Sequence, residues 1–418
     1  MSFDIQHRAI RISRLNIDFE SIKQFGWLLL AIFITSVLNY FSNIYVGRIL
    51  GPADYGIFIA MGSLSIIILV LANVVQTVAT NYVSVYRSKG DTDYVGGFCV
   101  FMHKRLLVWG IGIAAVLTLF SFPLASFLNL PSATPIIIIS MFAIPTALLP
   151  VVYGVQRGMQ RFGALGVTQI SSAVFRFVAV IGFLALGTGV AGAVISFPIS
   201  ALGAWVVGIL FLVDLLRLRS NHSYSMEGML KYSFNAMLAL TCFAILSNSD
   251  IILVKNRFSP IEAGIYSAIA TLGKTGFWLS SAVVVILLPK ATERYARGES
   301  AKGLLVQSLL VVAVLCVSVT IIFYLFSRLI VNIVFGSNYL MGAHILGLYG
   351  LAMTIQGLVY VMIIYFLAVK ERRYILFLLA GSILQIILFL ILPLNLAMVP
   401  VVLIGIGIFL LVGGVCVI

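Results

Sequence analysis

The chain is a succession of apolar segments, each long enough to span a membrane, separated by short polar connections. A helix needs about 20 apolar residues to cross the hydrocarbon core of a bilayer. Of the 418 residues, 62% are hydrophobic and 9% are charged, whereas about a quarter of the residues of a water-soluble globular protein are charged. These proportions exclude a soluble protein and predict an all-α integral membrane protein.

Twelve transmembrane helices are predicted, because charge clusters or Pro and Gly turns interrupt the apolar sequence between them. They lie near 25–46, 57–84, 105–127, 133–155, 164–186, 192–213, 233–254, 264–288, 303–327, 341–368, 374–393 and 396–416. The polar stretch 214–232 separates two groups of six. We therefore expect an N-terminal lobe over residues 1–213, a cytoplasmic inter-lobe loop over 214–232 and a C-terminal lobe over 233–418.

The basic residues lie mainly on one side of the predicted helices. The net charge is +13, from 26 Lys and Arg against 13 Asp and Glu. In a membrane protein this charge indicates topology rather than a nucleic-acid partner, because basic residues accumulate in cytoplasmic loops. With the N-terminus in the cytoplasm, 20 of the 26 cations fall on the cytoplasmic side, four outside and two within spans. Both termini are therefore predicted to be cytoplasmic.

An internal repeat relates residues 44–91 to residues 252–299 without a gap, at an offset of 208. Identical residues occupy both copies at Pro52, Gly56, Ile57, Ala60 and Leu64. Each copy starts at the end of the first span of a six-span half and runs through the second. Because six is even, the halves share one orientation and are related by an axis along the membrane normal. This predicts two pseudo-symmetric six-helix bundles, the plan of a transporter.

The run Val46-Gly-Arg-Ile-Leu-Gly-Pro-Ala-Asp-Tyr-Gly-Ile-Phe resembles the signature after the first helix of Wzx-type flippases. These are polysaccharide biosynthesis proteins of the multidrug/oligosaccharidyl-lipid/polysaccharide exporter superfamily. Segments that begin at Asp250, Ala263 and Leu288 resemble the matching region around that family's seventh and eighth helices.

The resemblance implies a flippase in the bacterial inner (plasma) membrane. It would move a polyprenyl-diphosphate-linked oligosaccharide repeat unit, for O-antigen, lipopolysaccharide or a similar surface polysaccharide, by alternating access. The implied partners are this lipid-linked oligosaccharide, membrane lipids, a polysaccharide polymerase and chain-length proteins. No nucleic acid, metal, cofactor or catalytic residue is expected.

Two cations are predicted inside spans, where a charge costs about 2.5–3.5 kcal/mol and usually marks a functional site. Arg176 shares a helix face with Gln169 and Ser172, and Lys274 lies on a polar stripe that includes Trp278. An ammonium group binds a diphosphate as a point charge, and a Trp ring stacks on a sugar. The structural alternatives are a snorkelling Arg176 and a polar seam between helices at Lys274.

The resemblance places the first, second, seventh and eighth helices beside a cleft between the lobes. Polar faces on the first two of these helices add Asn39, Asn73 and Gln76 to the predicted cavity. Asp250, on the seventh, is a candidate for coupling to a proton or sodium ion, although an ion pair with Lys255 is the favoured alternative.

Three basic residues are predicted at the outer mouth of the cleft: Arg48, Lys255 and Arg257. They are expected either to draw or release an anionic head group or to anchor the helices at the membrane interface.

Two other functions remain open. The first is a multidrug or organic-cation antiporter of the same superfamily, which a cavity holding two cations and few acids disfavours. The second is a membrane polysaccharide polymerase or ligase, an enzyme expected to carry a large extracytoplasmic loop, whereas the outer loops here are short.

Overall fold

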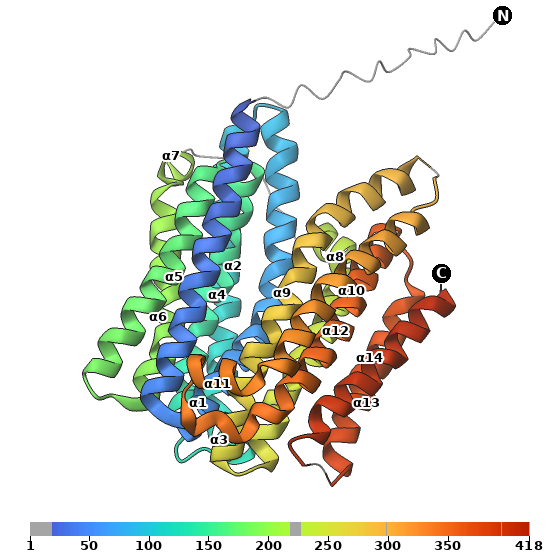
Figure 1. Ribbon diagram of the computed structural model, residues 1–418. Helices are drawn as coiled ribbons and strands as arrows, with labels where there is room; N and C mark the ends of the chain where they lie inside the picture. The colour runs from blue at the N-terminus through green and yellow to red at the C-terminus, as the bar shows by residue number, and fades with distance from the viewer. Residues whose placement is uncertain (1–18, 218–226, 298, 394, 418) are drawn as a thin grey trace, which may run out of the picture.

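The computed structural model describes residues 19–217, 227–297, 299–393 and 395–417, and all regular structure in these residues is helical (Figure 1). The helices in the first half of the chain are α1 (Phe19–Ser88), α2 (Thr92–Leu119), α3 (Ser121–Phe127), α4 (Thr134–Gly158), α5 (Phe162–Ala185), α6 (Gly189–Leu210) and α7 (Val213–Leu216). Those in the second half are α8 (Glu227–Arg257), α9 (Pro260–Ala296), α10 (Lys302–Leu325), α11 (Ser327–Val334), the 3₁₀ helix η1 (Ser337–Ile345), α12 (Leu346–Ala368), α13 (Arg373–Ile391) and α14 (Met398–Val417).

The prediction of twelve transmembrane helices is confirmed. α1 contains the first two, α2 with α3 contains the third, and each of the remaining nine falls on its own long helix. Among the described residues, ten stretches are long and apolar enough to cross a membrane. The second half of α1 and the whole of α9 complete the set of twelve.

The two copies of the repeat turn the chain by different local means. In α1 the bend lies at Gly51, whose φ of 74° favours glycine, and Pro52 follows without an N–H to donate. In the second copy the chain breaks between α8 and α9. There the Ser259 N–H and hydroxyl both donate to Glu262, and the Glu262 N–H donates to the Ser259 hydroxyl. This reciprocal cap begins α9.

The two bundles share a cluster of buried residues at one end. This cluster joins Tyr55 and Phe58 of the first bundle to Phe335 and Tyr339 of the second. The buried residues of two further clusters, toward the other end, come from one bundle each, although Met237 of α8 packs against the cluster of the first bundle. We call the shared end, which contains the connections 48–56, 127–133, 257–260 and 334–345, the sealed end. Figure 1 shows the bundles meeting at this lower end, near α3 and α11, and spreading apart above it.

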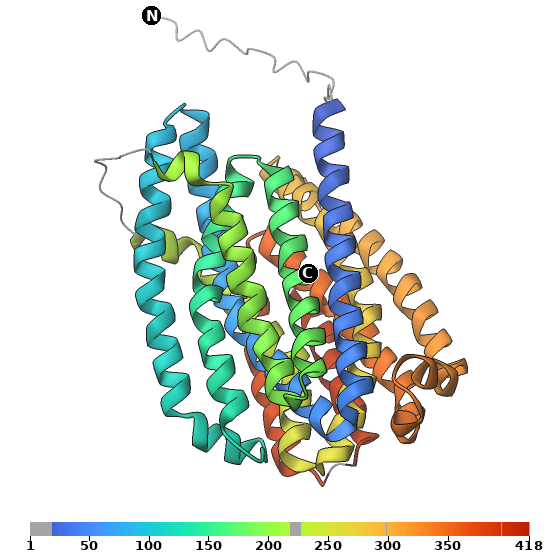
Figure 2. The ribbon, with the colours of Figure 1, turned by 90° about the vertical axis from the view of Figure 1, so that its left-hand side faces the viewer.

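α1 is the main link between the bundles. It packs on α4, α5 and α6 of its own bundle and on α8 and α9 of the other. Figure 2 shows its N-terminal half, in dark blue, between the green helices of the first bundle and the orange helices of the second.

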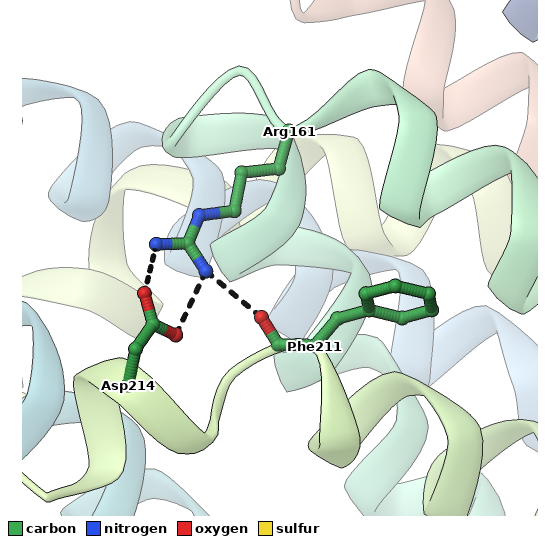
Figure 3. Close-up of polar contacts among 3 residues, drawn as sticks. All are labelled: Arg161, Phe211 and Asp214. Atoms are coloured by element: carbon green, nitrogen blue, oxygen red, sulfur yellow. Dashed lines mark hydrogen bonds and ion pairs between the residues drawn. The ribbon is translucent and has the colours of Figure 1, made fainter.

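A salt bridge joins two connections at the opposite end of the first bundle (Figure 3). Nη1 and Nη2 of Arg161, which precedes α5, pair with the carboxylate of Asp214 in α7. Arg161 Nη1 also donates to the Phe211 carbonyl oxygen at the end of α6, over 2.8 Å. A cation at a helix C-terminus is favourable because the carbonyl dipoles point toward it.

We expect Asp214→Asn to lower stability only slightly and only above acidic pH. The Arg161 guanidinium holds the pKa of the Asp214 carboxyl below its usual range, mainly through the hydrogen bond. A depressed carboxyl pKa gives stability that is present above the unfolded pKa of about 3.9 and is lost as pH falls through the folded value.

Because both side chains are partly exposed, we expect a loss of at most about 1 kcal/mol. Thermal unfolding of the purified protein at pH 7 and at pH 3 measures this. A difference between wild type and variant that is as large at pH 3 as at pH 7 would contradict the assignment.

Candidate functional site

A hydrogen bond between two side chains joins the bundles inside the sealed end. The Tyr55 hydroxyl, on the second span of the first bundle, lies 3.1 Å from Thr271 Oγ1 on α9. Tyr55 is fully buried, and its ring packs on Phe335 and Tyr339 at centroid distances of 5.3 and 6.1 Å. Each bundle holds one of the two intramembrane cations predicted from the sequence, Arg176 on α5 and Lys274 on α9.

Arg176 on α5 is held by neutral partners. Its Nη1 and Nη2 donate to Oδ1 of Asn39 and Oδ1 of Asn43, each over 3.0 Å. The guanidinium stands over the rings of Phe197 and Phe58, at 4.6 and 5.7 Å from their centroids. Its Nε is buried without a hydrogen-bond partner, and no acid among the described residues forms an ion pair with it. The guanidinium group is therefore held in one orientation, and no acid in the described part of the chain neutralises its positive charge.

Arg176 and Lys274 belong to different bundles, and each is close to one residue of the inter-bundle bond. Arg176 interacts electrostatically with Tyr55. Lys274 is one turn beyond Thr271 on α9, and its Nζ donates to Asn248 Oδ1 on α8 over 3.0 Å. Each bundle therefore contributes one cation, held by an amide oxygen, beside the place where the bundles touch.

Asp250 is not ion-paired with Lys255, which was the favoured alternative from the sequence. Its Oδ2 accepts hydrogen bonds from the hydroxyls of Tyr266 on α9, over 2.9 Å, and Tyr349 on α12, over 3.0 Å. Its Oδ1 is buried without a partner. Asp250 interacts electrostatically with Lys274, although no ion pair between them occurs within the described residues. Lys255, only 2% exposed, is attracted instead by Asp54 of the first bundle.

The other predicted cavity residues are placed differently. Trp278 is 65% exposed, with its ring beside Phe277. With its amide oxygen turned toward α4, Gln76 accepts from Nη1 and Nε of Arg157 at 2.8 and 3.3 Å. The Asn73 side chain lies outside the described residues. The structure therefore brings Asn39 to Arg176, and Gln76 to a different arginine.

The two arginines predicted at the outer mouth bind backbone carbonyl oxygens at helix ends. Arg48 Nε donates to Val334 over 2.8 Å, and its Nη2 donates to Ile333, at the C-terminus of α11. Arg257 Nη1 donates to Leu392 over 2.9 Å and to Phe389, at the C-terminus of α13.

Several residues of this site were missed by sequence reasoning. Asn43 had a usable signal, because it lies one helical turn after Asn39 on the same face. Tyr349 and Arg157 had none, since their partners are about 100 and 80 residues away with no periodicity to connect them.

The twelve-helix architecture matches the fold of solved transporters of the MOP superfamily. An inward-facing multidrug resistance MATE family transporter of that superfamily superposes with a TM-score of 0.73 at 15% identity, covering 93% of this chain and 97% of that one. An outward-facing MATE structure gives 0.63 at 14%, covering 94% of each. The lipid II flippase MurJ, in an inward closed conformation, gives 0.71 at 15%, covering 93% and 86%.

A family model described as polysaccharide biosynthesis protein matches residues 21–293, and the chain belongs to this family. A comparison with curated protein sequences gave no significant match.

We expect Tyr266→Phe and Tyr349→Phe each to destabilise the second bundle by about 1.5–3 kcal/mol, the range for a hydrogen bond to a charged group. Each removes one of two donors to the buried Asp250 carboxylate. Tyr360→Phe is the matched control, because the Tyr360 ring packs on Phe243 and Phe277 in the same bundle. Thermal unfolding in detergent measures all three. Equal losses in the three variants would show that Asp250 does not depend on these hydroxyls.

Proposed function

We propose that this protein is a flippase for a polyprenyl-diphosphate-linked oligosaccharide repeat unit of a bacterial surface polysaccharide, such as O-antigen. The observation that carries the proposal is the pair Arg176 and Lys274, one from each bundle, beside the Tyr55–Thr271 contact. A bilayer core excludes a charged head group. A cation from each bundle would supply a charged path for it, while the polyprenyl tail stays in lipid.

The positive charge of the site favours this cargo over organic cations. Unit charges 4 Å apart interact by about 4 kcal/mol at an effective dielectric constant of 20, attractive for a diphosphate and repulsive for a cation. Asp250, the acid that interacts with Lys274 among the described residues, already accepts two tyrosine hydroxyls. A multidrug antiporter is therefore the second candidate. A polymerase or ligase is a weaker one, because no bond needs to be made or broken for the movement proposed.

We further propose how the protein is oriented in the membrane and that the structure represents its inward-facing conformation. With both termini in the cytoplasm of a bacterial inner membrane, as the distribution of basic residues favours, the sealed end faces outward and the bundles diverge toward the cytoplasm. The higher similarity to the inward-facing than to the outward-facing MATE structure supports this. Residues 1–213 and 233–418 would then be the two moving lobes, with 214–232 as the cytoplasmic loop between them.

The remaining predicted residues take secondary roles in this proposal. Trp278, exposed on α9 one turn beyond Lys274, is the candidate for stacking on a sugar. Asp250, with its unpaired Oδ1, is the candidate for coupling to a proton or sodium ion. Arg48, Lys255 and Arg257 lie at the end where the head group would leave. A polymerase and chain-length proteins would be the partners that receive the product.

We expect Arg176→Ala and Lys274→Ala each to reduce transport of a fluorescent lipid-linked oligosaccharide in proteoliposomes roughly tenfold or more, because tenfold corresponds to only 1.4 kcal/mol. Membrane insertion should be preserved, since removing a charge within a span eases insertion. Arg176→Lys and Lys274→Arg should retain part of the activity. Arg373→Ala, at an exposed arginine between spans, is the control. Normal transport by both alanine variants would exclude these residues from the substrate path.

Deletion of the gene should leave a lipid-linked repeat unit stranded on the cytoplasmic leaflet and remove the corresponding surface polysaccharide. Surface polysaccharide, accumulated lipid-linked repeat and drug susceptibility are measured in the same strain. Unchanged polysaccharide together with raised sensitivity to cationic dyes would overturn the flippase proposal in favour of the antiporter.

A further inference from the structure

Two side chains at repeat-equivalent positions each reach a helix end in the opposite bundle. Arg48, on α1 of the first bundle, donates to the carbonyl oxygens of Ile333 and Val334 at the end of α11. The repeat offset of 208 relates Arg48 to Asn256 on α8 of the second bundle. The side-chain amide of Asn256 donates to the carbonyl oxygen of Phe127, the last residue of α3.

The segments that follow these two short helices donate in the reverse direction. After α3, Asn129 Nδ2 of the first bundle donates to the Asn256 carbonyl oxygen, over 2.5 Å, near the end of α8. After α11, the Tyr339 hydroxyl of the second bundle donates to the Gly47 carbonyl oxygen, over 2.6 Å, near the end of the first span. The pattern is reciprocal about the pseudo-two-fold axis.

These bonds differ from ordinary helix caps in where the donor comes from. The last carbonyl groups of a helix have no donor within the helix and need one from elsewhere. Here the donor belongs to the other bundle, so separating the bundles at the sealed end leaves the carbonyl oxygens without it. Arg257 makes the same kind of bond to Leu392, but both residues belong to the second bundle. That cap would survive a separation.

We propose that the four cross-bundle caps, made by Arg48, Asn256, Asn129 and Tyr339, hold the sealed end shut. The bundles would part there only by giving up all four. Arg48 contributes most, because it alone carries a charge toward a helix C-terminus and binds two carbonyl oxygens. Once separated, its guanidinium has no carbonyl partner and faces the new opening. A role for this freed guanidinium rests on the proposed function, since it would place a free cation where an anionic head group leaves.

The opening of the sealed end can be measured without any cargo. Spin labels at Phe122→Cys on α3 and Ile261→Cys on α9 report the distance between the bundles there, because these side chains are 75% and 57% exposed. The four native cysteines are replaced by alanine in this background. Pulsed electron–electron double resonance in nanodiscs then gives the populations of closed and open forms.

Arg48→Ala should lower the ratio of closed to open forms about two- to fivefold, the change that loss of a solvent-exposed charge at a helix C-terminus would produce. Arg48→Lys should restore part of the closed form, because the charge remains but the paired geometry is lost. Asn256→Ala should have a smaller effect in the same direction. Arg257→Ala is the matched control and should leave the distribution as in wild type.

Tyr339→Phe removes one cap by losing only a hydroxyl, and it keeps the test decisive if Arg48→Ala does not fold. It too should populate the open form. If Arg48→Ala folds and matches Arg257→Ala, or if Tyr339→Phe and Asn256→Ala both leave the distribution unchanged, the cross-bundle caps do not hold the sealed end. Such a result would leave the transport assays of Arg176 and Lys274 unaffected, so the two proposals can fail separately.

Discussion

The close approach of Gly56 to Gly264 sets the geometry between the bundles. A Cβ atom on Gly56 would lie 3.0 Å from backbone atoms of Gly264, and one on Gly264 would lie 1.6 Å from the Pro52 carbonyl oxygen. The two glycines occupy the same position in the repeat, so the pseudo-two-fold axis passes through their contact. Because neither carries a side chain, the second and eighth spans touch through their backbones. Tyr55 then reaches Thr271, and each bundle holds one of the two cations.

Both cations donate hydrogen bonds to neutral amide oxygens. A carboxylate beside Arg176 would offset its burial but would cancel the charge that an anion recognises. Asn39 and Asn43 orient the guanidinium without this loss, and the rings of Phe197 and Phe58 add cation–π attraction. The amide of Asn248 likewise orients Lys274, which also interacts electrostatically with Asp250. For Arg176, dipoles and aromatic faces lower the cost of burial and leave the charge available.

The sequence was informative where the bilayer or the repeat constrains it. Apolar length predicts the spans, and the cost of an intramembrane charge singles out Arg176 and Lys274. The offset of the repeat places Gly56 opposite Gly264 in the alignment before any contact is known. These features depend on composition and spacing along one segment.

Most partners of the site could not be predicted, for two physical reasons. Arg48 and Arg257 bind carbonyl oxygens, which every residue carries, so the residues at the accepting positions give no signal. Asp250 depends on Tyr266 and Tyr349, which other helices bring to it, and nothing in local periodicity connects them. The favoured ion pair with Lys255 was wrong: Asp250 accepts hydrogen bonds from the two tyrosines, and Lys255 interacts electrostatically with Asp54 of the other bundle.

The uncancelled charge of Arg176 has a consequence for the energetics of a transport cycle. If the cargo is a diphosphate, the loaded site is close to neutral or negative, whereas the empty site carries a positive charge. A membrane potential does work of about 2.3 kcal/mol on each elementary charge moved through 100 mV, and proportionately less for a partial displacement. A potential that is negative inside would therefore draw the empty, cationic site back toward the cytoplasm. The resting voltage of the cell would then drive the return step and give outward movement of the anion its direction.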